Sequence, residues 1–174
     1  MESPHMTEPK INPAPAPAAK DSPESFLPQS TVLLVDDNAQ NLELLQAFLE
    51  SLPVKLITAF DGIDALEKVA EHKPDLILLD VMMPRMSGFQ VCKRLKSDAK
   101  TRDIQILMVT ALNELGDIEQ ANECGTDDFV SKPVNKLELL TRVKSLLRVR
   151  HLKSELERAL TYLNEIEQED DEVL

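Results

Sequence analysis

Residues 75–84 read Asp-Leu-Ile-Leu-Leu-Asp-Val-Met-Met-Pro, and this stretch decides the fold. Within it, Leu76–Leu79 is a continuous apolar run that ends at an acid, Asp80. A short apolar run without polar alternation is typical of a parallel strand that is covered on both faces. A second run of this kind, Val32–Val35, also ends at acids. The two runs therefore predict a buried parallel sheet that carries carboxylates at one edge.

Outward from these runs, short apolar segments alternate with helical periods. We expect strands at Thr31–Asp36, Val54–Ala59, Asp75–Leu79, Ile104–Val109 and Asp128–Val130, and helices near 39–51, 62–71, 88–97 and 113–123. A last helix is expected from Leu137 to about Glu167, with Asn135 as its cap. Five strands that alternate with helices predict an α/β fold with a doubly wound, five-stranded parallel sheet.

The last helix is longer than a domain of this kind needs. Its apolar residues after the domain follow heptad spacing: Val149, Leu152, Leu156, Ala159, Leu163 and Ile166. We therefore expect a disordered Pro/Ala-rich arm over 1–30, a globular domain over 31–148, a helical extension over 149–168 that forms a short coiled coil, and an acidic tail over 169–174. The alternative for the heptad stripe is packing against its own domain.

Composition excludes several classes of function. The 174 residues carry 31 acids and 19 bases, a net charge of −12, which disfavours binding to nucleic acid and to anionic membranes. A basic stretch between residues 142 and 153 is interpreted as a solvated helix face. No apolar run is long enough for a membrane span. The two cysteines, Cys92 and Cys124, form no CxxC motif, so we expect a cytoplasmic protein.

Charged and polar residues follow four of the predicted strands. In an open α/β sheet the carboxyl ends of the strands form the ligand site, and the residues at these ends are Asp36, Asp37, Asp80, Thr110 and Lys132. Three clustered carboxylates raise one another's pKa unless a cation joins them. Oxygen ligands with water suit Mg²⁺, and no His or Cys lies at this edge to favour zinc. With Mg²⁺ bound, Asp80 can act as a nucleophile that forms an acyl phosphate.

The chain resembles the receiver domain of two-component response regulators over about residues 31–150. Five separated elements carry the resemblance in order: Val32–Asn38, Asp75–Pro84, Gly88, Val109–Ala111 and Gly125–Pro133. The resemblance implies a flavodoxin-like sheet with strand order 2-1-3-4-5. The segment Met108–Asp117 and the long last helix look most like receivers that precede diguanylate cyclase domains. A receiver fragment of such a larger regulator is therefore the alternative to a receiver without an output domain.

The resemblance also implies roles for single residues at the metal site. Asp80 would accept a phosphoryl group from a histidine kinase or a phosphotransfer protein. Asp37 would bind Mg²⁺ directly, Asp36 mainly through water, and Met82 through its backbone carbonyl. Taken singly, Asp36 and Asp37 could instead cap a helix, and Met82 with Met83 could simply pack in a loop.

Other implied roles belong to the response to phosphorylation. Thr110 would hydrogen-bond the phosphoryl group, Lys132 would pair with one of its oxygens, and the Lys132–Pro133 bond would be cis. Phe129 matches the aromatic position that turns inward when Thr110 moves. Taken alone, Thr110 is a strand-end residue, Lys132-Pro133 a turn and Phe129 a core residue.

The expected output is a change in protein contacts. Phosphorylation would bias the face made of helix 4, strand 5 and helix 5, and the last helix would carry this change into a homodimer that uses this face and the extension. Catalysis is expected only on its own aspartate. A dehalogenase-like phosphatase would need an acid where Met82 stands, and the four scattered glycines form no nucleotide-binding loop. A flavin binder would not need the acid cluster. A degenerate receiver would not retain the full set of acids, Thr and Lys.

Overall fold

The computed structural model describes residues 27, 30–111, 120 and 123–171. Its centre is a five-stranded sheet in the order β2-β1-β3-β4-β5, with parallel pairing throughout. The strands are β1 (Thr31–Val35), β2 (Lys55–Ala59), β3 (Leu76–Asp80), β4 (Gln105–Thr110) and β5 (Asp128–Ser131). The predicted fold class and strand order are confirmed. The strand ends lie within one residue of expectation, and this shift makes Asp80 and Thr110 the last residues of their strands.

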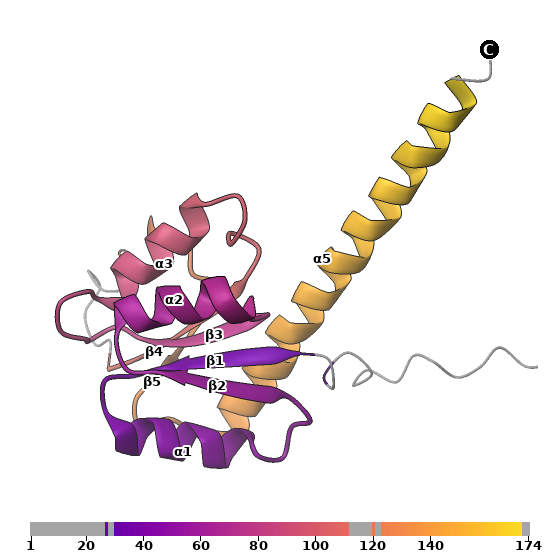
Figure 1. Cartoon of the computed structure of the whole chain (residues 1–174). Helices are drawn as coiled ribbons and strands as arrows, with labels where there is room; N and C mark the ends of the chain where they lie inside the picture. The colour runs from indigo at the N-terminus through magenta and orange to yellow at the C-terminus, as the bar shows by residue number, and fades with distance from the viewer. Residues whose placement is uncertain (1–26, 28–29, 112–119, 121–122, 172–174) are drawn as a thin grey trace, which may run out of the picture.

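Helices cover both faces of the sheet, as Figure 1 shows. They are α1 (Ala39–Leu49), α2 (Gly62–His72), α3 (Gly88–Ser97) and α5 (Lys136–Asp171). Alternation along the strands decides which layer each side chain joins. Val32 and Leu34 of β1 pack with α1 and α5, whereas Leu33 and Val35 pack with α2 and α3. Both faces of the central strands are therefore buried, as the continuous apolar runs predict.

Side-chain caps begin the helices at the expected places. Asn38 accepts from the backbone amides of residues 40 and 41, Asp61 caps α2, and Ser87 and Gln90 form a capping box at α3. The Oδ1 atom of Asn135 accepts from the amide of residue 138 at 3.1 Å and starts α5. The helix expected near 113–123 falls largely outside the described residues.

Helix α5 continues well beyond the sheet, and its C-terminal half rises clear of the domain in Figure 1. At 36 residues it is about 54 Å long. It ends at Asp171, four residues after the end that the sequence predicts, and so includes part of the expected acidic tail. None of the described helices is long and apolar enough to cross a membrane.

The extension exposes its apolar stripe, so the alternative that this stripe packs on its own domain is wrong. Its exposed large apolar residues are Val149, Leu152, Leu156, Leu160, Tyr162, Leu163 and Ile166. The side that faces the domain is polar instead: Arg150, His151, Ser154 and Arg158 line a hollow of about 300 Å³ with Ser30 and Asp75.

Two residues assigned to the disordered arm belong to the fold. Leu27 is only 1% exposed and joins the core cluster on the α1 and α5 face. Ser30 donates its amide to the Leu27 carbonyl at 3.0 Å and accepts from the Lys55 amide at 3.0 Å. A single leucine in a proline-rich context gives no periodic signal, which is why the sequence pattern missed it. The rest of the expected arm, residues 1–26, 28 and 29, lies outside the described residues.

Candidate functional site

Two neighbouring strand ends bring three carboxylates together. Val35 of β1 is in register with Leu79 of β3, so the residues that follow them lie side by side. One carboxylate oxygen from each of Asp36, Asp37 and Asp80 lies within 4.8 Å of the other two. Asp36 and Asp80 are buried, whereas Asp37 is exposed. The structure thus gathers the three acids that the sequence placed at this edge.

Lys132 reaches this group from the loop after β5. Its Nζ atom donates to Oδ1 of Asp80 at 3.0 Å and to Oδ2 of Asp36 at 3.2 Å. The ammonium therefore bridges the two buried acids across 96 and 52 residues of sequence. The adjoining Lys132–Pro133 peptide bond is cis, as expected.

The charges of this group are unevenly balanced. Burial raises the pKa of the Asp80 carboxyl, and the negative charge of Asp36 adds to this effect, while the hydrogen bond and the charge of Lys132 oppose it. Burial lowers the pKa of the Lys132 ammonium, but its hydrogen bonds and ion pairs with Asp80 and Asp36 outweigh burial and raise it. The two shifts have different causes, because burial raises the pKa of Asp80 whereas the two acids raise the pKa of Lys132.

The donor set fits a hard divalent cation. Three carboxylates facing one ammonium leave an excess of negative charge, and the exposed position of Asp37 keeps the cluster open to solvent. Mg²⁺ typically takes one or two carboxylates and keeps several water molecules. The two cysteines do not add sulfur ligands that would favour zinc, because they are buried elsewhere in the core.

Thr110 ends the neighbouring strand with an unsatisfied hydroxyl. Val109 is in register with Asp80, so Thr110 lies one residue beyond that level at the same edge of the sheet. The residue is 1% exposed, and its Oγ1 atom is buried without a hydrogen-bond partner among the described residues. A buried hydroxyl in this state carries a cost of about 1–3 kcal/mol, which an incoming acceptor oxygen would remove.

Asn41 is the site residue that sequence reasoning missed. Its Nδ2 atom donates to both oxygens of Asp36, at 3.1 and 3.0 Å, and the Asn38 amide donates to Oδ1 of Asp36 at 2.9 Å. These bonds fix the direction of the Asp36 carboxylate. One sign of this role was available in the sequence: Asn41 is an amide residue on the first turn of α1, on the side that faces back to β1. The alternative that Asp36 and Asp37 cap α1 is wrong, because Asn38 is the cap.

The loop after Asp80 folds back on the strand end. The amides of Met83 and Gly88 both donate to the Val81 carbonyl, at 3.2 and 3.0 Å. Gly88 also brings the start of α3 against β3 so closely that a Cβ there would lie 2.2 Å from the Asp80 carbonyl oxygen. Arg85 of the same loop forms an ion pair with Asp61, the cap of α2.

The remaining candidate residues lie on the surface nearby. Phe129 is 40% exposed, so the alternative that it is a core residue is wrong. Met82 is exposed, whereas Met83 is buried in the cluster with α2 and α3, so only Met83 packs as the loop alternative proposes.

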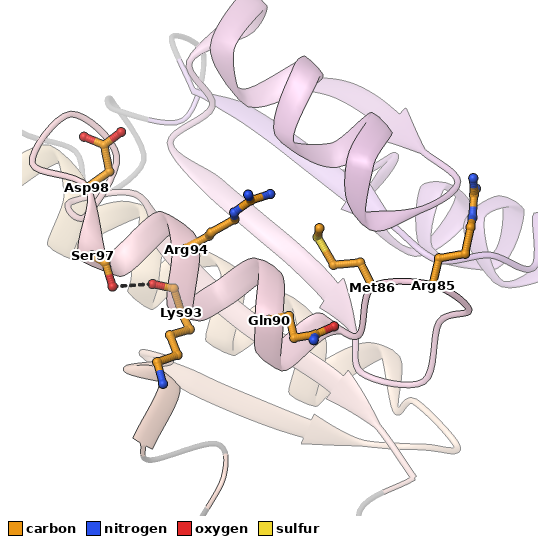
Figure 2. Close-up of a pocket in the computed structure, with 7 residues that line it drawn as sticks. All are labelled: Arg85, Met86, Gln90, Lys93, Arg94, Ser97 and Asp98. Atoms are coloured by element: carbon orange, nitrogen blue, oxygen red, sulfur yellow. Dashed lines mark hydrogen bonds between the residues drawn. The ribbon is translucent and has the colours of Figure 1, made fainter.

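The larger of two surface hollows near the acid cluster does not contain the clustered acids. A hollow of about 550 Å³ follows α3 and is lined by Arg85, Met86, Gln90 and Arg94 among others (Figure 2). None of the clustered acids borders it. A smaller hollow of about 250 Å³ is lined by Asp36, Asn41 and Lys132, together with apolar residues of α1 and of the loop after β5. We therefore place the candidate site by its charges and hydrogen bonds rather than by the size of a cavity.

Comparison with known proteins agrees with this geometry. Residues 32–144 match the response regulator receiver domain family. The chain is 46% identical over 125 residues to the response regulator PleD of Caulobacter vibrioides, and the match covers 72% of this chain and 28% of PleD. It is 36% identical over 121 residues to the polar-differentiation response regulator DivK of Brucella anthropi, which covers 70% of this chain and 98% of DivK.

A solved structure shows the same architecture. The receiver domain of the sensor histidine kinase PA1611 of Pseudomonas aeruginosa superposes with a TM-score of 0.63 at 28% identity, over 68% of this chain and 97% of that one. That structure has a magnesium ion coordinated in its active-site cleft. The chain spans little more than a quarter of the length of PleD.

Proposed function

The chain belongs to the response regulator receiver family, a family of phosphoacceptor domains, and from this premise we propose that Asp80 is its phosphoacceptor. The donor is the phosphohistidine of a histidine kinase or of a phosphotransfer protein. A carboxylate oxygen of Asp80 attacks the phosphorus, the bond from phosphorus to the imidazole nitrogen breaks, and an acyl phosphate forms.

The observation that carries this proposal is the set of groups around Asp80. Its carboxylate is buried at the end of a strand, with the Lys132 ammonium at 3.0 Å. The buried Thr110 hydroxyl, which has no partner in the described part of the chain, supplies a donor for a phosphoryl oxygen. The reaction needs positioning and charge neutralisation more than covalent chemistry, and these groups provide both.

Asp36, Asp37 and Asp80 would hold Mg²⁺, with the Met82 backbone carbonyl and water as further ligands. When bound, Mg²⁺ supplies positive charge that offsets the phosphoryl oxygens. Asn41 keeps the Asp36 carboxylate in a fixed direction for this purpose. The magnesium ion in the PA1611 receiver supports the same use of this cleft.

Treatment with acetyl phosphate and Mg²⁺ should add one phosphoryl group per chain, as measured by intact mass. Removal of divalent ions with EDTA should abolish the addition, because the crowded carboxylates then lack their counter-charge. Borohydride reduction followed by peptide mapping should place the modification at Asp80. A phosphoryl group on another residue, or addition that persists in EDTA, would contradict the proposal.

The proposed output is a change in protein contacts rather than an enzymatic reaction on another substrate. The negative charge on Asp80 draws Thr110 and Lys132 toward it, and the exposed ring of Phe129 moves into the space that Thr110 leaves. The face made of β5, α5 and the helix expected near 113–123 then differs between two states. Helix α5 carries the change into the extension over 149–168, where two copies associate. We place this activity in the cytoplasm, consistent with two buried cysteines that form no disulfide.

Beryllofluoride with Mg²⁺, which mimics the phosphorylated carboxylate, should shift the protein from monomer toward dimer in sedimentation velocity. The physical reason is that each copy exposes a stripe of large apolar side chains on its extension, which a dimer removes from water. Leu156→Glu should prevent the shift, because Leu156 lies at the centre of the stripe. A protein that stays monomeric with beryllofluoride would disprove the dimer switch and leave the phosphoacceptor assignment intact.

A further inference from the structure

The apolar face of the extension is turned away from the rest of the molecule. We define the extension stripe as Val149, Leu152, Leu156, Ala159, Leu163 and Ile166, whose large members are between 38% and 61% exposed. The residues on the opposite side of the helix line the hollow beside Ser30 and Asp75. None of the described residues of this chain covers the stripe, so it is open to a helix of another chain.

Charge is distributed asymmetrically along the same helix. Residues 135–153 contain six bases and one acid, whereas residues 154–174 contain one base and eight acids. Two such helices that pair in parallel bring basic segments together at one end and acidic segments together at the other. An antiparallel pair instead lays each basic segment beside an acidic one, which is the complementary arrangement.

We propose that two copies of this chain pair through the extension stripe in antiparallel orientation, with the basic beginning of each extension, residues 148–153, toward the acidic end of the other. This inference rests on the proposed homodimer and adds its direction. The occupant of the stripe is thus a second copy of the chain. The two receiver domains lie at opposite ends of the helix pair, so in this dimer the copies meet through the extension alone and not through the face that includes β5.

One register brings the whole stripe into contact. Val149 faces Ile166 of the second copy, Leu152 faces Leu163, and Leu156 faces Ala159, and each contact occurs twice because of the twofold symmetry. A shift by one heptad in either direction leaves two of the six positions without a partner. The free end of α5 points away from the sheet in Figure 1, so a second helix has room to lie along the stripe.

Flanking charges separate the two orientations. Arg148 and Lys153 are both exposed at the edges of the stripe. In a parallel pair Arg148 lies beside Lys153 of the second copy, and like charges repel. In the antiparallel register Arg148 lies beside position 169 of the second copy, which is a glutamate in the sequence. A charge reversal at position 148 therefore has opposite consequences in the two cases.

The test measures dimer dissociation by sedimentation equilibrium of the full chain with beryllofluoride and Mg²⁺. For the antiparallel pair, Arg148→Glu should raise the dissociation constant roughly tenfold, because two attractive contacts become repulsive. Adding Glu169→Arg to Arg148→Glu should restore it to within about threefold of the original. Lys153→Glu, the matched control, should change it little, because Lys153 then faces Leu160 of the second copy.

Cross-linking gives a geometric readout of the same dimer. Copies with Val149→Cys should cross-link to copies with Ile166→Cys in a mixture, and copies with Val149→Cys should not cross-link to one another, because the two residues 149 lie about 25 Å apart along an antiparallel pair. Self cross-linking of Val149→Cys, or tighter dimers of Arg148→Glu and Lys153→Glu, would establish parallel pairing and overturn this inference alone. Absence of any dimer would remove the proposed homodimer as well, while phosphorylation of Asp80 would still be measurable by mass.

Discussion

Asp80→Asn is expected to abolish phosphoryl uptake completely and, without metal, to make the fold more stable. The loss of uptake follows because the amide oxygen of asparagine is a poor nucleophile, and an acyl phosphate cannot form on it. Thr110, Lys132 and the other acids remain in place in this variant. The loss of phosphorylation would therefore come from the missing nucleophile and not from an altered site.

The gain in stability follows from the direction of the Asp80 pKa. Burial raises the pKa of this carboxyl above its ordinary value of 3.8, so the folded state disfavours the charged form. Ionised Asp80 therefore lowers the free energy of unfolding at neutral pH, and a neutral side chain of the same shape removes this cost. Lys132 keeps an acidic partner in Asp36, at 3.2 Å.

The raised pKa of Asp80 also determines how the stability difference between wild type and Asp80→Asn changes with pH. Below pH 3.8 the carboxyl is protonated in both the folded and the unfolded chain, so the two proteins should not differ through this group. As the pH rises above that value the unfolded chain releases its proton first, and wild type should become progressively less stable than Asp80→Asn. Urea denaturation in EDTA between acidic and neutral pH measures the difference.

Asp98→Asn is the matched control, since Asp98 is exposed at the far end of α3 and lies outside the acid cluster. This variant should retain phosphorylation and show a different pH profile from Asp80→Asn. If Asp80→Asn were less stable than wild type at neutral pH, the attraction of Lys132 for Asp80 would outweigh burial. The same outcome would overturn the view that the acid cluster needs an added cation.

The strands and the acid cluster could be predicted because their signals are local and redundant. The apolar runs Val32–Val35 and Leu76–Leu79 have only one arrangement that buries both faces, and the acids that follow them must then share one edge of the sheet. Lys132 could be placed at the same edge because it follows the last predicted strand, but nothing local shows that its ammonium reaches across to Asp36 at the end of β1.

Other features depend on tertiary contacts that leave no pattern in the chain. The contact of Asn41 with Asp36 depends on how α1 leaves β1, and an isolated asparagine gives no sign of it. Leu27 is a single apolar residue whose burial depends on the surrounding helices. The heptad pattern of the extension predicted an apolar stripe, but only the position of the sheet shows that this stripe faces solvent.

Gly88→Ala is expected to damage both the fold and the site, because there is no room for a side chain at this position. A Cβ at residue 88 would lie 2.2 Å from the Asp80 carbonyl oxygen and 2.9 Å from the Cα atom of Val81, and both contacts are with backbone. Relief requires α3 to move away from the end of β3. We expect a loss of roughly 3 kcal/mol in the free energy of unfolding.

The matched control is Gly125→Ala. It makes the same substitution at a glycine where the expected cost comes from backbone conformation and not from a steric clash. Gly125 has a φ of +82°, and the nearest contact of an added Cβ there is 3.4 Å from Cγ of Lys96, so the cost is backbone strain of about 1 kcal/mol without a clash. This variant should retain phosphorylation of Asp80. Gly88→Ala should lose most of it even where the protein is still folded, because the shift of α3 moves the loop that carries Met82 and the end of β3.

Urea denaturation and acetyl phosphate labelling, measured on both variants under conditions that keep each one folded, separate the two effects. Equal losses of stability would mean that the close approach of α3 to Asp80 is relieved without cost. Normal labelling of folded Gly88→Ala would mean that the geometry of Asp80 does not depend on this packing. Either result would contradict the view that the Asp80 carboxylate is positioned by the contact between the start of α3 and the end of β3.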